Sequence, residues 1–437
     1  MILSDLNTLS LPARTVAKVS RRIIPYFFVL YIIAYIDRAN VAFAKLSMQA
    51  DLGFSEAVFG LGAGIFFIGY FLLEIPGCLI VERWSARLWI SRILISWGIC
   101  TVVIGFINTP RQFYIARFFL GLAEAGFFPG AIVYFTHWFP PRERARALAG
   151  FILGVPISFL VGAPLSAWCL SIDWFGLAGW RWIFILQGLP AILFGFISLF
   201  YLTDRPKDAK WLEPAERKWL DEELRQESER KKAAFGHVGV FQALRQRHVL
   251  TLAAVLWCVV LANYGVVLWL PTTIQRASGF SNVRSTLYST LPFLVATLSV
   301  WYLGRSSDRT GERKLHTAIP LFLCGVFFAL SVIPGQSFPL VMVWLCLTGL
   351  MLWAFAPSFW VLPTLTLGQS AAAASVGLIN SIGNLGGFVG PSVAGYLLSG
   401  NTPYWAAMLF LCAGFFVAGA LVLSLKIPAE PLKDSAT

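Results

Sequence analysis

The chain has 437 residues, of which 57% are hydrophobic and only 13% are charged, and its mean hydropathy is +0.71. A water-soluble domain carries nearer ~25% charged residues, so this composition excludes an ordinary soluble protein and indicates one that is embedded in lipid. The formal net charge of +12 would suit a nucleic-acid-binding protein, but the positions of the basic residues, described below, explain it otherwise.

Twelve apolar segments follow one another along the chain, and each is close to the ~20 residues that an α-helix needs to cross the hydrocarbon core of a membrane. We expect all of them to be helices, because an open strand would leave backbone groups unpaired in lipid. The stretch 204–248 is the one long polar stretch, and it separates six segments from six. The expected segments are about 23–47, 57–81, 89–108, 112–137, 145–171, 181–203, 249–275, 284–304, 315–334, 338–362, 374–399 and 403–426.

The predicted fold is therefore an all-α membrane protein with twelve transmembrane helices in two pseudo-symmetric six-helix bundles. Within the polar stretch, acidic residues stand four positions before basic ones, as in Asp221–Arg225 and Glu227–Lys231, which is typical of a solvated helix. We interpret that helix as a linker between the halves, with a docking site for a partner as the alternative. The expected parts are an N-terminal tail 1–22, a first bundle 23–203, a linker 204–248, a second bundle 249–426 and a C-terminal tail 427–437.

Basic residues are distributed unevenly among the loops. If the N-terminus lies in the cytoplasm, the loops and tails on that side hold most of the 34 Lys and Arg residues. This asymmetry follows the positive-inside rule, so it places both termini in the cytoplasm and explains the net charge without a nucleic-acid partner. The loops on the other side hold five: Lys45, Arg111, Arg181, Arg276 and Arg284.

The reactive side chains form no motif of an enzyme or of a metal site. The seven cysteines all lie in apolar segments, so we expect them to be reduced packing residues. The four histidines lie in loops or at expected helix ends, without metal-ligand spacing. The sequence contains no Walker phosphate loop and no nucleophile elbow. We therefore predict no catalytic residues, no metal and no cofactor, with the proton gradient as the energy source.

The two halves repeat one another. The loop GRSSDRTGERK (304–314) has a counterpart in CLIVERWSARL (78–88), at an offset of 226 residues, and 150–170 aligns with 377–397 at an offset of 227. Parallel repeats of two six-helix halves are the architecture of one large class of transporters. The charged residues of the two loops coincide: Asp308 with Glu82, Arg309 with Arg83, and Arg313 with Arg87.

A small set of ionisable residues is expected at membrane depth, away from the helix ends. A charge at the bilayer centre costs at least ~2.5 kcal/mol, so such residues usually face a cavity and mark the path of a substrate or a proton. The alternative is a purely structural ion pair within a bundle. The residues are Asp37, Arg38, Glu74, Arg117 and Glu124.

Arg38 is expected roughly 10–13 Å below the outer end of the first helix, and Arg117 roughly 8–9 Å below that of the fourth, at 1.5 Å per residue. The two guanidinium groups therefore lie in neighbouring layers and can converge on one ligand. Glu124 follows Arg117 by seven residues and lies two turns deeper on the same face. Guanidinium groups bind carboxylates in bidentate geometry and keep their proton, whereas Glu124 and Asp37 can lose theirs. This combination predicts the uptake of an organic anion together with protons.

The second half is uncharged at the equivalent positions and offers neutral polar and aromatic groups instead. We therefore predict that the first half holds the charge and the proton, and that the second half recognises the shape of the substrate. Asn380 and Asn384 are four residues apart and share a helix face. The candidates in the second half are Asn263, Tyr264, Ser358, Trp360, Asn380 and Asn384.

Glu74 precedes Pro76 in FLLEIPGCLI and is expected on the inner half of the second helix. We expect it to satisfy a helix end or to pair across the bundle. A second proton site is the alternative.

Four stretches resemble the anion:cation symporter family of the major facilitators: YIDRANVAFA, ARFFLGLAEAGFFPG, FAPSFWVLPT and NSIGNLGGFVGP. The resemblance covers about 20–426. Members of that family include bacterial permeases for tartrate, phthalate, hydroxybenzoates and sugar acids, and the animal sialin and vesicular glutamate carriers are distant relatives. The seventh helix lacks the arginine that the glutamate carriers have there, so the resemblance is to the bacterial permeases.

The stretch from Gly304 to Lys314 also resembles the loop signature of major facilitators, G-x-x-x-D-R-x-G-x-R-K, in full, whereas the first copy departs from it at Cys78, Glu82 and Ser85. By this resemblance, the loop charges latch helices together on the cytoplasmic side. The alternative is that they act only as topology signals. The residues of this expected gating motif are Glu82, Arg83, Arg87, Asp308, Arg309 and Arg313.

The resemblance implies that Arg38 and Arg117 bind the substrate carboxylate. It also implies that Asp37 and Glu124 are the proton-coupling acids. The residues that it implies as further lining of the cavity are Tyr35, Tyr70, Ser358, Trp360 and Asn384.

The sequence thus predicts a secondary transporter in the inner membrane that imports an organic carboxylate with protons by alternating access. The substrate is expected to be a dicarboxylate, an aromatic acid or a sugar acid, and the protein a monomer in the lipid bilayer. An exchanger or facilitator without proton coupling is the alternative within transport. A transporter-like receptor is a further alternative, which the eleven residues after Lys426 disfavour because they hold no signalling domain.

Overall fold

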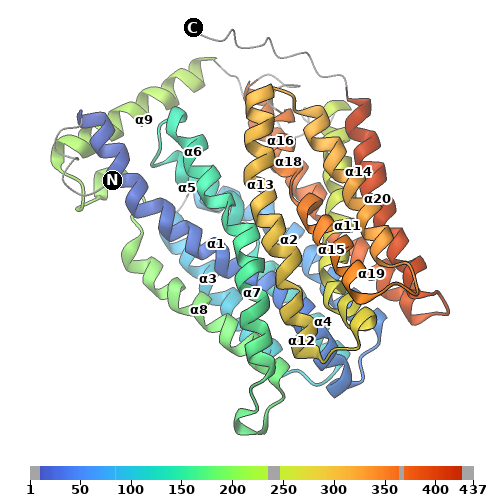
Figure 1. The fold of residues 1–437 in the computed structure, drawn as a ribbon. Coiled ribbons are helices and arrows are strands. Elements are labelled where there is room, and N and C mark those ends of the chain that lie inside the picture. Colours follow the sequence, from blue (N-terminus) through green and yellow to red (C-terminus); the bar gives the residue numbers. More distant parts are fainter. Residues whose placement is uncertain (1–9, 84, 235–246, 364–368, 426–437) are drawn as a thin grey trace.

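The computed structural model describes residues 10–83, 85–234, 247–363 and 369–425 and shows helices joined by short connections throughout these ranges. Two helical bundles lie side by side, one from each half of the chain (Figure 1). The first bundle consists of α1 (Leu11–Leu52), α2 (Glu56–Arg83), α3 (Ala86–Ile104), α4 (Pro110–Glu124), α5 (Phe127–Thr136), α6 (Pro141–Ile152), α7 (Gly154–Leu170) and α8 (Gly179–Tyr201).

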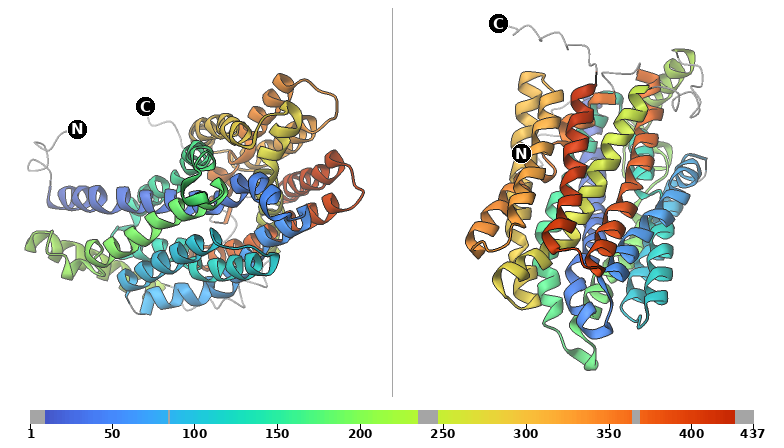
Figure 2. Two further views of the ribbon diagram at one scale, coloured as in Figure 1. Left: turned by 90° about the horizontal axis from the view of Figure 1, so that it is seen from below. Right: turned by 90° about the vertical axis from the view of Figure 1, so that its right-hand side faces the viewer.

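The second bundle repeats this plan, and Figure 2 shows the two bundles next to each other from two further directions. A separate helix, α9 (Pro214–Ala234), lies in the linker between them. The second bundle consists of α11 (Arg247–Ser278), α12 (Asn282–Tyr288), α13 (Thr290–Thr310), α14 (Lys314–Ser331), α15 (Phe338–Leu352), α16 (Ala356–Phe359), α18 (Gln369–Asn384), α19 (Gly386–Ser399) and α20 (Tyr404–Ser424).

Eleven helical segments among the described residues are long and apolar enough to cross a membrane. The segment that the sequence predicted at 374–399 appears instead as two shorter helices, α18 and α19, which meet at Leu385. The expected N-terminal tail also differs, because α1 already begins at Leu11 and continues through 42 residues. The protein is therefore a multi-pass, all-helical membrane protein.

A break between α4 and α5 positions the end of α4. Ala125 leaves the helical conformation, and Gly126 has φ +85°, in the left-handed region that favours glycine. A β-carbon on Gly126 would also lie 3.2 Å from the Cα of Gly77 in α2. The close approach of the two backbones fixes the chain immediately after Glu124, so this carboxylate sits at a well-defined turn inside the bundle.

Helix α2 is packed tightly between its own bundle and the other one. A β-carbon on Gly121 of α4 would lie 2.0 Å from the carbonyl oxygen of Phe66, and one on Gly60 of α2 would lie 2.2 Å from that of Pro391 in α19. Small residues allow helix backbones to approach closely in membranes, where van der Waals packing drives helix association. As a result, α2 is in backbone contact with α4 of its own bundle and with α19 of the other.

The two ends of the molecule differ. We call the end with α9, the start of α1 and the end of α20 the linker end, and the end with the α1–α2 turn at Gly53 the distal end (Figure 1). At the distal end, polar contacts join the two bundles. The Ser399 hydroxyl accepts a hydrogen bond from the backbone N–H of Ala57 at 2.8 Å, and the Asn282 amide donates one to the Ser47 hydroxyl at 3.0 Å.

At the linker end, ion pairs attach α9 to the first bundle. Arg14 and Lys18 of α1 both reach Glu216, at 2.9 Å and 2.8 Å. Arg144 of α6 binds both carboxylate oxygens of Glu227, at 3.1 Å and 3.0 Å. The linker helix is thus clamped to the first bundle by α1 and α6 together.

Candidate functional site

A small cavity lies where α1, α2 and α4 of the first bundle face α11 and α19 of the second. It has room for little more than one water molecule. Its walls are apolar except for two guanidinium groups and one phenol. The lining residues are Arg38, Val41, Ala42, Ala63, Phe66, Phe67, Arg117, Tyr264, Val267, Leu268 and Pro391.

Arg38 and Glu124 form an ion pair at this cavity. The Nε atom of Arg38 lies 2.5 Å from Oε1 of Glu124, and the Glu124 side chain is fully buried. The rings of Tyr35 and Tyr70 lie 5.1 Å and 4.9 Å from the Arg38 guanidinium carbon, within the range of cation–π attraction. The Tyr264 hydroxyl of α11 lies 3.5 Å from Nη1 of Arg38. Arg38 therefore has contacts in both halves of the protein.

Arg117 is held by the backbone of α2. Its Nε donates to the carbonyl oxygen of Gly62 at 3.2 Å, and Nη2 donates to that of Ala63 at 3.4 Å. The guanidinium carbon lies 4.8 Å from the ring centroid of Phe66. Nη1 is buried and has no hydrogen-bond partner among the described residues. Arg117 is thus a buried cation at the cavity, and one of its donors is left unused by the described residues.

Asp37 points away from the cavity, although it is adjacent to Arg38 in sequence. Its fully buried carboxylate accepts hydrogen bonds from the Asn40 amide and from the Thr101 hydroxyl of α3, both at 2.9 Å. Successive residues on an α-helix diverge by ~100°, so neighbouring side chains serve different surroundings. Arg38 thus faces the cavity, whereas Asp37 faces the interior of the first bundle.

Glu74 pairs across the two halves. Its Oε1 accepts a hydrogen bond from the amide of Asn380 in α18 at 2.5 Å, and the residue is only 3% exposed. Tyr70 lies one helical turn before Glu74 on α2 and so shares its face. Glu74 therefore continues the row of side chains that leads from Arg38 towards the linker end, and it pairs across the bundle as the sequence predicted.

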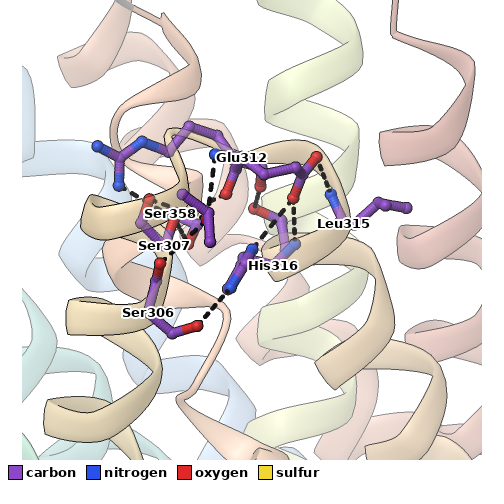
Figure 3. Close-up of polar contacts among 9 residues, drawn as sticks. Ser306, Ser307, Glu312, Leu315, His316 and Ser358 are labelled. Atoms are coloured by element: carbon purple, nitrogen blue, oxygen red, sulfur yellow. Dashed lines mark hydrogen bonds and ion pairs between the residues drawn. The ribbon is translucent and has the colours of Figure 1, made fainter. Parts of the chain in front are cut away.

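The structure places most candidates of the second half outside the cavity, and of these candidates Tyr264 alone lines it. The Asn263 amide is directed to the carbonyl oxygen of Leu352 at 3.5 Å. Trp360 is half-buried where α16 ends, and Asn384 is half-buried at the end of α18. Ser358 donates a hydrogen bond to the Ser307 hydroxyl at 2.9 Å, next to the loop at the linker end (Figure 3).

The sequence of this chain matches the model of the Major Facilitator Superfamily over residues 27–391. The chain belongs to this superfamily. The membership that the sequence predicted is confirmed, and the protein is a transporter and not an enzyme.

Relatives in the superfamily align with nearly the whole chain. A protein of Agrobacterium vitis named putative tartrate transporter is 42% identical over 96% of this chain and 95% of its own length. A quinolone resistance transporter of Acinetobacter baumannii is 38% identical over 92% and 93%. The putative metabolite transport protein NicT of Pseudomonas putida is 36% identical over 95% and 94%. All three relatives are named as transport or transporter proteins, and the alignments cover at least 92% of this chain.

The fold also matches a solved structure. A bacterial homologue of the human lysosomal transporter Spinster, in an inward-facing and unoccupied conformation, aligns with a TM-score of 0.70. The two share 19% sequence identity, and the alignment covers 93% of this chain and 94% of the other. This likeness supports the major facilitator fold for the whole chain.

The expected gating motif of this major facilitator is partly visible. The carboxylate of Asp204 accepts hydrogen bonds from the backbone N–H of Arg87 and from the Ser85 hydroxyl, both at 2.9 Å. In the second half, Nη1 of Arg313 donates to the Ser307 hydroxyl at 3.0 Å, and Arg309 is exposed. The side chains of three members lie outside the described residues: Glu82, Arg83 and Asp308.

In the second copy, the loop is tied together by serines and by Glu312 (Figure 3). Ser307 donates to the carbonyl oxygen of Glu312 at 2.9 Å, and the Glu312 carboxylate accepts from the backbone N–H of Leu315 and of His316. Burial opposes the ionised form of Glu312, but these N–H groups outweigh it and hold the pKa of Glu312 below its usual value. Each copy of the motif thus ties its own half together.

Sequence reasoning missed the apolar lining of the cavity, although a signal was present. Val41 and Ala42 follow Arg38 by three and four residues, which places them on the same helix face. Val267 and Leu268 follow Tyr264 at the same spacing. The faces that carry the polar candidates therefore also carry the lining of the cavity.

Proposed function

We propose that this major facilitator imports an organic carboxylate together with protons by alternating access. The observation that carries this proposal is the Arg38–Glu124 ion pair beside the unused donor of Arg117. Two fixed cations line one small cavity between the halves, and one titratable carboxylate is paired with the first of them, Arg38. The fixed cations attract an anion, and the carboxylate supplies a place for a proton.

Competition for Arg38 couples the anion to the proton. While Glu124 is ionised, it occupies the Nε edge of Arg38. Protonation of Glu124 removes the ion pair and frees this edge for the carboxylate of a substrate, which also reaches the free Nη1 of Arg117. Guanidinium–carboxylate pairs are among the strongest hydrogen-bonded contacts in proteins. Anion and proton therefore bind together and leave together.

Because Glu124 is buried, an anion can replace it on Arg38 only when Glu124 takes up a proton. An ionised Glu124 without its partner would be an unpaired buried charge, which is strongly unfavourable. An anion that displaced it without a proton would create such a charge. We therefore assign the coupled proton to Glu124, with Asp37 as the second acid, held by Asn40 and Thr101.

The second half senses the anion through Tyr264. Its hydroxyl lies next to Arg38, and Phe67 of α2 packs edge-on against its ring at 4.6 Å. A carboxylate between Arg38 and Arg117 changes the surroundings of this phenol directly. Among the other expected substrate contacts, Tyr35 and Tyr70 act by holding Arg38 through their rings.

We assign the linker end to the cytoplasm of the cell, in the inner membrane. The described loops at that end carry most of the basic residues, which follows the positive-inside rule. The distal end is then the outer end. A small carboxylic acid of the tartrate type is the first substrate to test, because two relatives are named putative tartrate transporters.

The test is uptake of labelled tartrate and other organic acids into proteoliposomes with an imposed pH gradient. We expect accumulation that a protonophore abolishes. Arg117→Gln should reduce uptake at least tenfold, because it removes one of the two cations. Arg111→Gln is the matched control, since Arg111 lies on the same helix but is exposed at the distal end.

Uptake that is insensitive to the protonophore would indicate a facilitator or an exchanger. Full uptake by Arg117→Gln would contradict the role of the arginine pair.

A further inference from the structure

A second buried ion pair lies away from the cavity, at the distal end. The Nζ atom of Lys45, near the end of α1, lies 2.9 Å from Oε2 of Glu56, the first residue of α2. The Lys45 side chain is 0% exposed, which is rare for a lysine. Both residues belong to the first bundle, and the anion site uses neither of them.

Helix α11 of the second bundle covers this pair with two polar groups. The Thr272 hydroxyl accepts a hydrogen bond from Nζ of Lys45 at 3.1 Å. The indole N–H of Trp269 donates one to Oε2 of Glu56 at 3.0 Å, and the Trp269 ring centroid lies 5.2 Å from the Lys45 ammonium. Trp269 and Thr272 are three residues apart, so they present one helix face to the pair.

We infer that these four residues, Lys45, Glu56, Trp269 and Thr272, form the outer seal of the transporter. The seal is closed in this structure, and it opens when α11 moves away while Lys45 and Glu56 stay together. The inference rests on alternating access, which is part of the proposed function, but not on the identity of the substrate or on proton coupling.

The chemistry of the seal suits a contact that must be made and broken. A dry ion pair carries a large desolvation penalty, which water removes when the halves separate. Each charge keeps its partner in the open state, so opening leaves no isolated ion. Closing exchanges water for two hydrogen bonds to charged groups, which are stronger than neutral ones. The desolvation penalty favours the open state and the two hydrogen bonds favour the closed state. Because they oppose each other, the two states stay close in free energy.

The seal is also connected to the anion site through α11. Tyr264, beside Arg38, precedes Thr272 by eight residues, a distance of about 12 Å along the helix axis. Because Tyr264 and Thr272 belong to one helix, a movement of α11 at the anion site also displaces Thr272 at the seal.

The test measures how far the outer end opens. Spin labels at Ala50 of α1 and Asn401, before α20, report the distance between the halves by double electron–electron resonance, in a background without native cysteines. Thr272→Val removes the acceptor for Lys45, and Trp269→Phe removes the donor to Glu56. Each is expected to raise the ratio of the open to the closed outer end about five- to tenfold.

A matched control lies one position away. The Thr273 hydroxyl is also buried, but it bonds to the Tyr404 hydroxyl and to the carbonyl oxygen of Trp269, within the second bundle. Thr273→Val is therefore expected to leave the ratio within about twofold of the parent protein. Thr272→Ser keeps a hydroxyl and is expected to behave like the parent.

If Thr272→Val and Trp269→Phe open the outer end no more than Thr273→Val does, these four residues do not hold the outer end closed and the inference is wrong. Uptake assays on the same proteins separate this result from the proposed function. Proton-coupled uptake by the parent with an unchanged outer distance in both seal variants overturns the seal alone. Absence of coupled uptake, with distances that shift as expected, overturns the proposed function alone.

Discussion

Arg38 and Glu124 are 86 residues apart in sequence, and their side chains meet at 2.5 Å inside the first bundle. Among the described residues, this is the ion pair that a cavity arginine forms. The protonation state of Glu124 therefore decides whether Arg38 is available to another anion. Oε2 of Glu124 has no hydrogen-bond partner among the described residues, so the contact with Arg38 dominates the surroundings of this carboxylate. In the proposed function, this ion pair couples the protonation of Glu124 to the binding of an anion by Arg38.

Glu124→Gln is expected to uncouple transport from the proton gradient. Glutamine resembles the protonated acid, so Arg38 is permanently available to an anion, but no proton can be carried. Accumulation driven by a pH gradient should fall at least tenfold, whereas counterflow exchange of labelled for unlabelled substrate should persist. Proteoliposome assays of both kinds check this. Equal loss of accumulation and exchange would show that Glu124 serves binding and not coupling.

Gly121→Ala is expected to displace Arg117 by forcing α4 away from α2. The added β-carbon would lie 2.0 Å from the carbonyl oxygen of Phe66, which is a rigid backbone atom. We expect a lower melting temperature and weaker binding of the anion, measured by thermal shift with and without substrate. Overpacking of this kind costs about 1–3 kcal/mol.

Gly377→Ala supplies the control for that experiment. A β-carbon on Gly377, inside α18, meets no atom within 4 Å. Alanine at an unhindered helix position is favoured over glycine by about 0.5–1 kcal/mol, so this variant should be as stable as the parent or slightly more stable. If both glycine variants behave alike, the close approach of α4 to α2 is not what positions Arg117.

The attachment of α9 to α1 is expected to weaken in acid. Burial disfavours the ionised form of Glu216, but the hydrogen bond from Lys18 and the one from the backbone N–H of Glu213 outweigh it, so the pKa of Glu216 lies below its usual value. A carboxyl with a lowered pKa contributes stability above its unfolded pKa and loses it as the pH falls through the folded value. The protection of the α9 amides, measured as the exchange rate relative to the intrinsic rate at the same pH, should therefore be high near neutral pH and fall below about pH 4.

Glu216→Gln should abolish most of this dependence and accelerate exchange already at neutral pH. Glu229→Gln, on the exposed side of α9, is the control, because Glu229 pairs only with the exposed Arg225 among the described residues. Protection of α9 that is the same at pH 7 and pH 3.5 in the parent protein would refute the role of Glu216.

His137 is expected to have no part in the pH dependence of transport. Burial, together with the nearby Arg205, lowers the pKa of His137 to about 4, so the imidazole stays neutral from pH 5 to pH 8. The pH profile of uptake in His137→Gln should therefore match that of the parent over this range. A shifted profile would show that His137 titrates during the cycle. Any lost stability from His137 would appear only as the pH falls below about 6.5, where the unfolded imidazole becomes charged.

Much of this architecture could be predicted from the sequence, because apolar length alone reveals helices that cross a membrane. The two cavity arginines were also predictable, since charged residues at membrane depth are few and costly. Their convergence followed from counting residues along α1 and α4. The surroundings of Asp37 were harder to predict, because Thr101 of α3, which donates a hydrogen bond to it, is an ordinary polar residue in the sequence.

The contacts of the second half could not be predicted in the same way. Ser358 and Asn263 are polar residues in apolar segments, like Tyr264, but only Tyr264 lines the cavity. Which face of a helix meets the cavity depends on the rotation of that helix against its neighbours, and sequence spacing does not specify this rotation. The interruption at Leu385 and the one at Gly126 likewise arise from packing between helices, and not from the apolar pattern.

The attachment of Arg117 to main-chain carbonyl oxygens has an evolutionary consequence. Substitution of a side chain on α2 leaves the carbonyl groups of Gly62 and Ala63 in place, so mutations around the cavity do not directly remove the partners that hold this cation. Substitutions at neighbouring positions that line the cavity, such as Ala63 and Val267, change its shape and polarity while the anchor for the anion persists. A lineage built on this scaffold can therefore acquire new cargoes by small steps without first losing the ability to bind an acid.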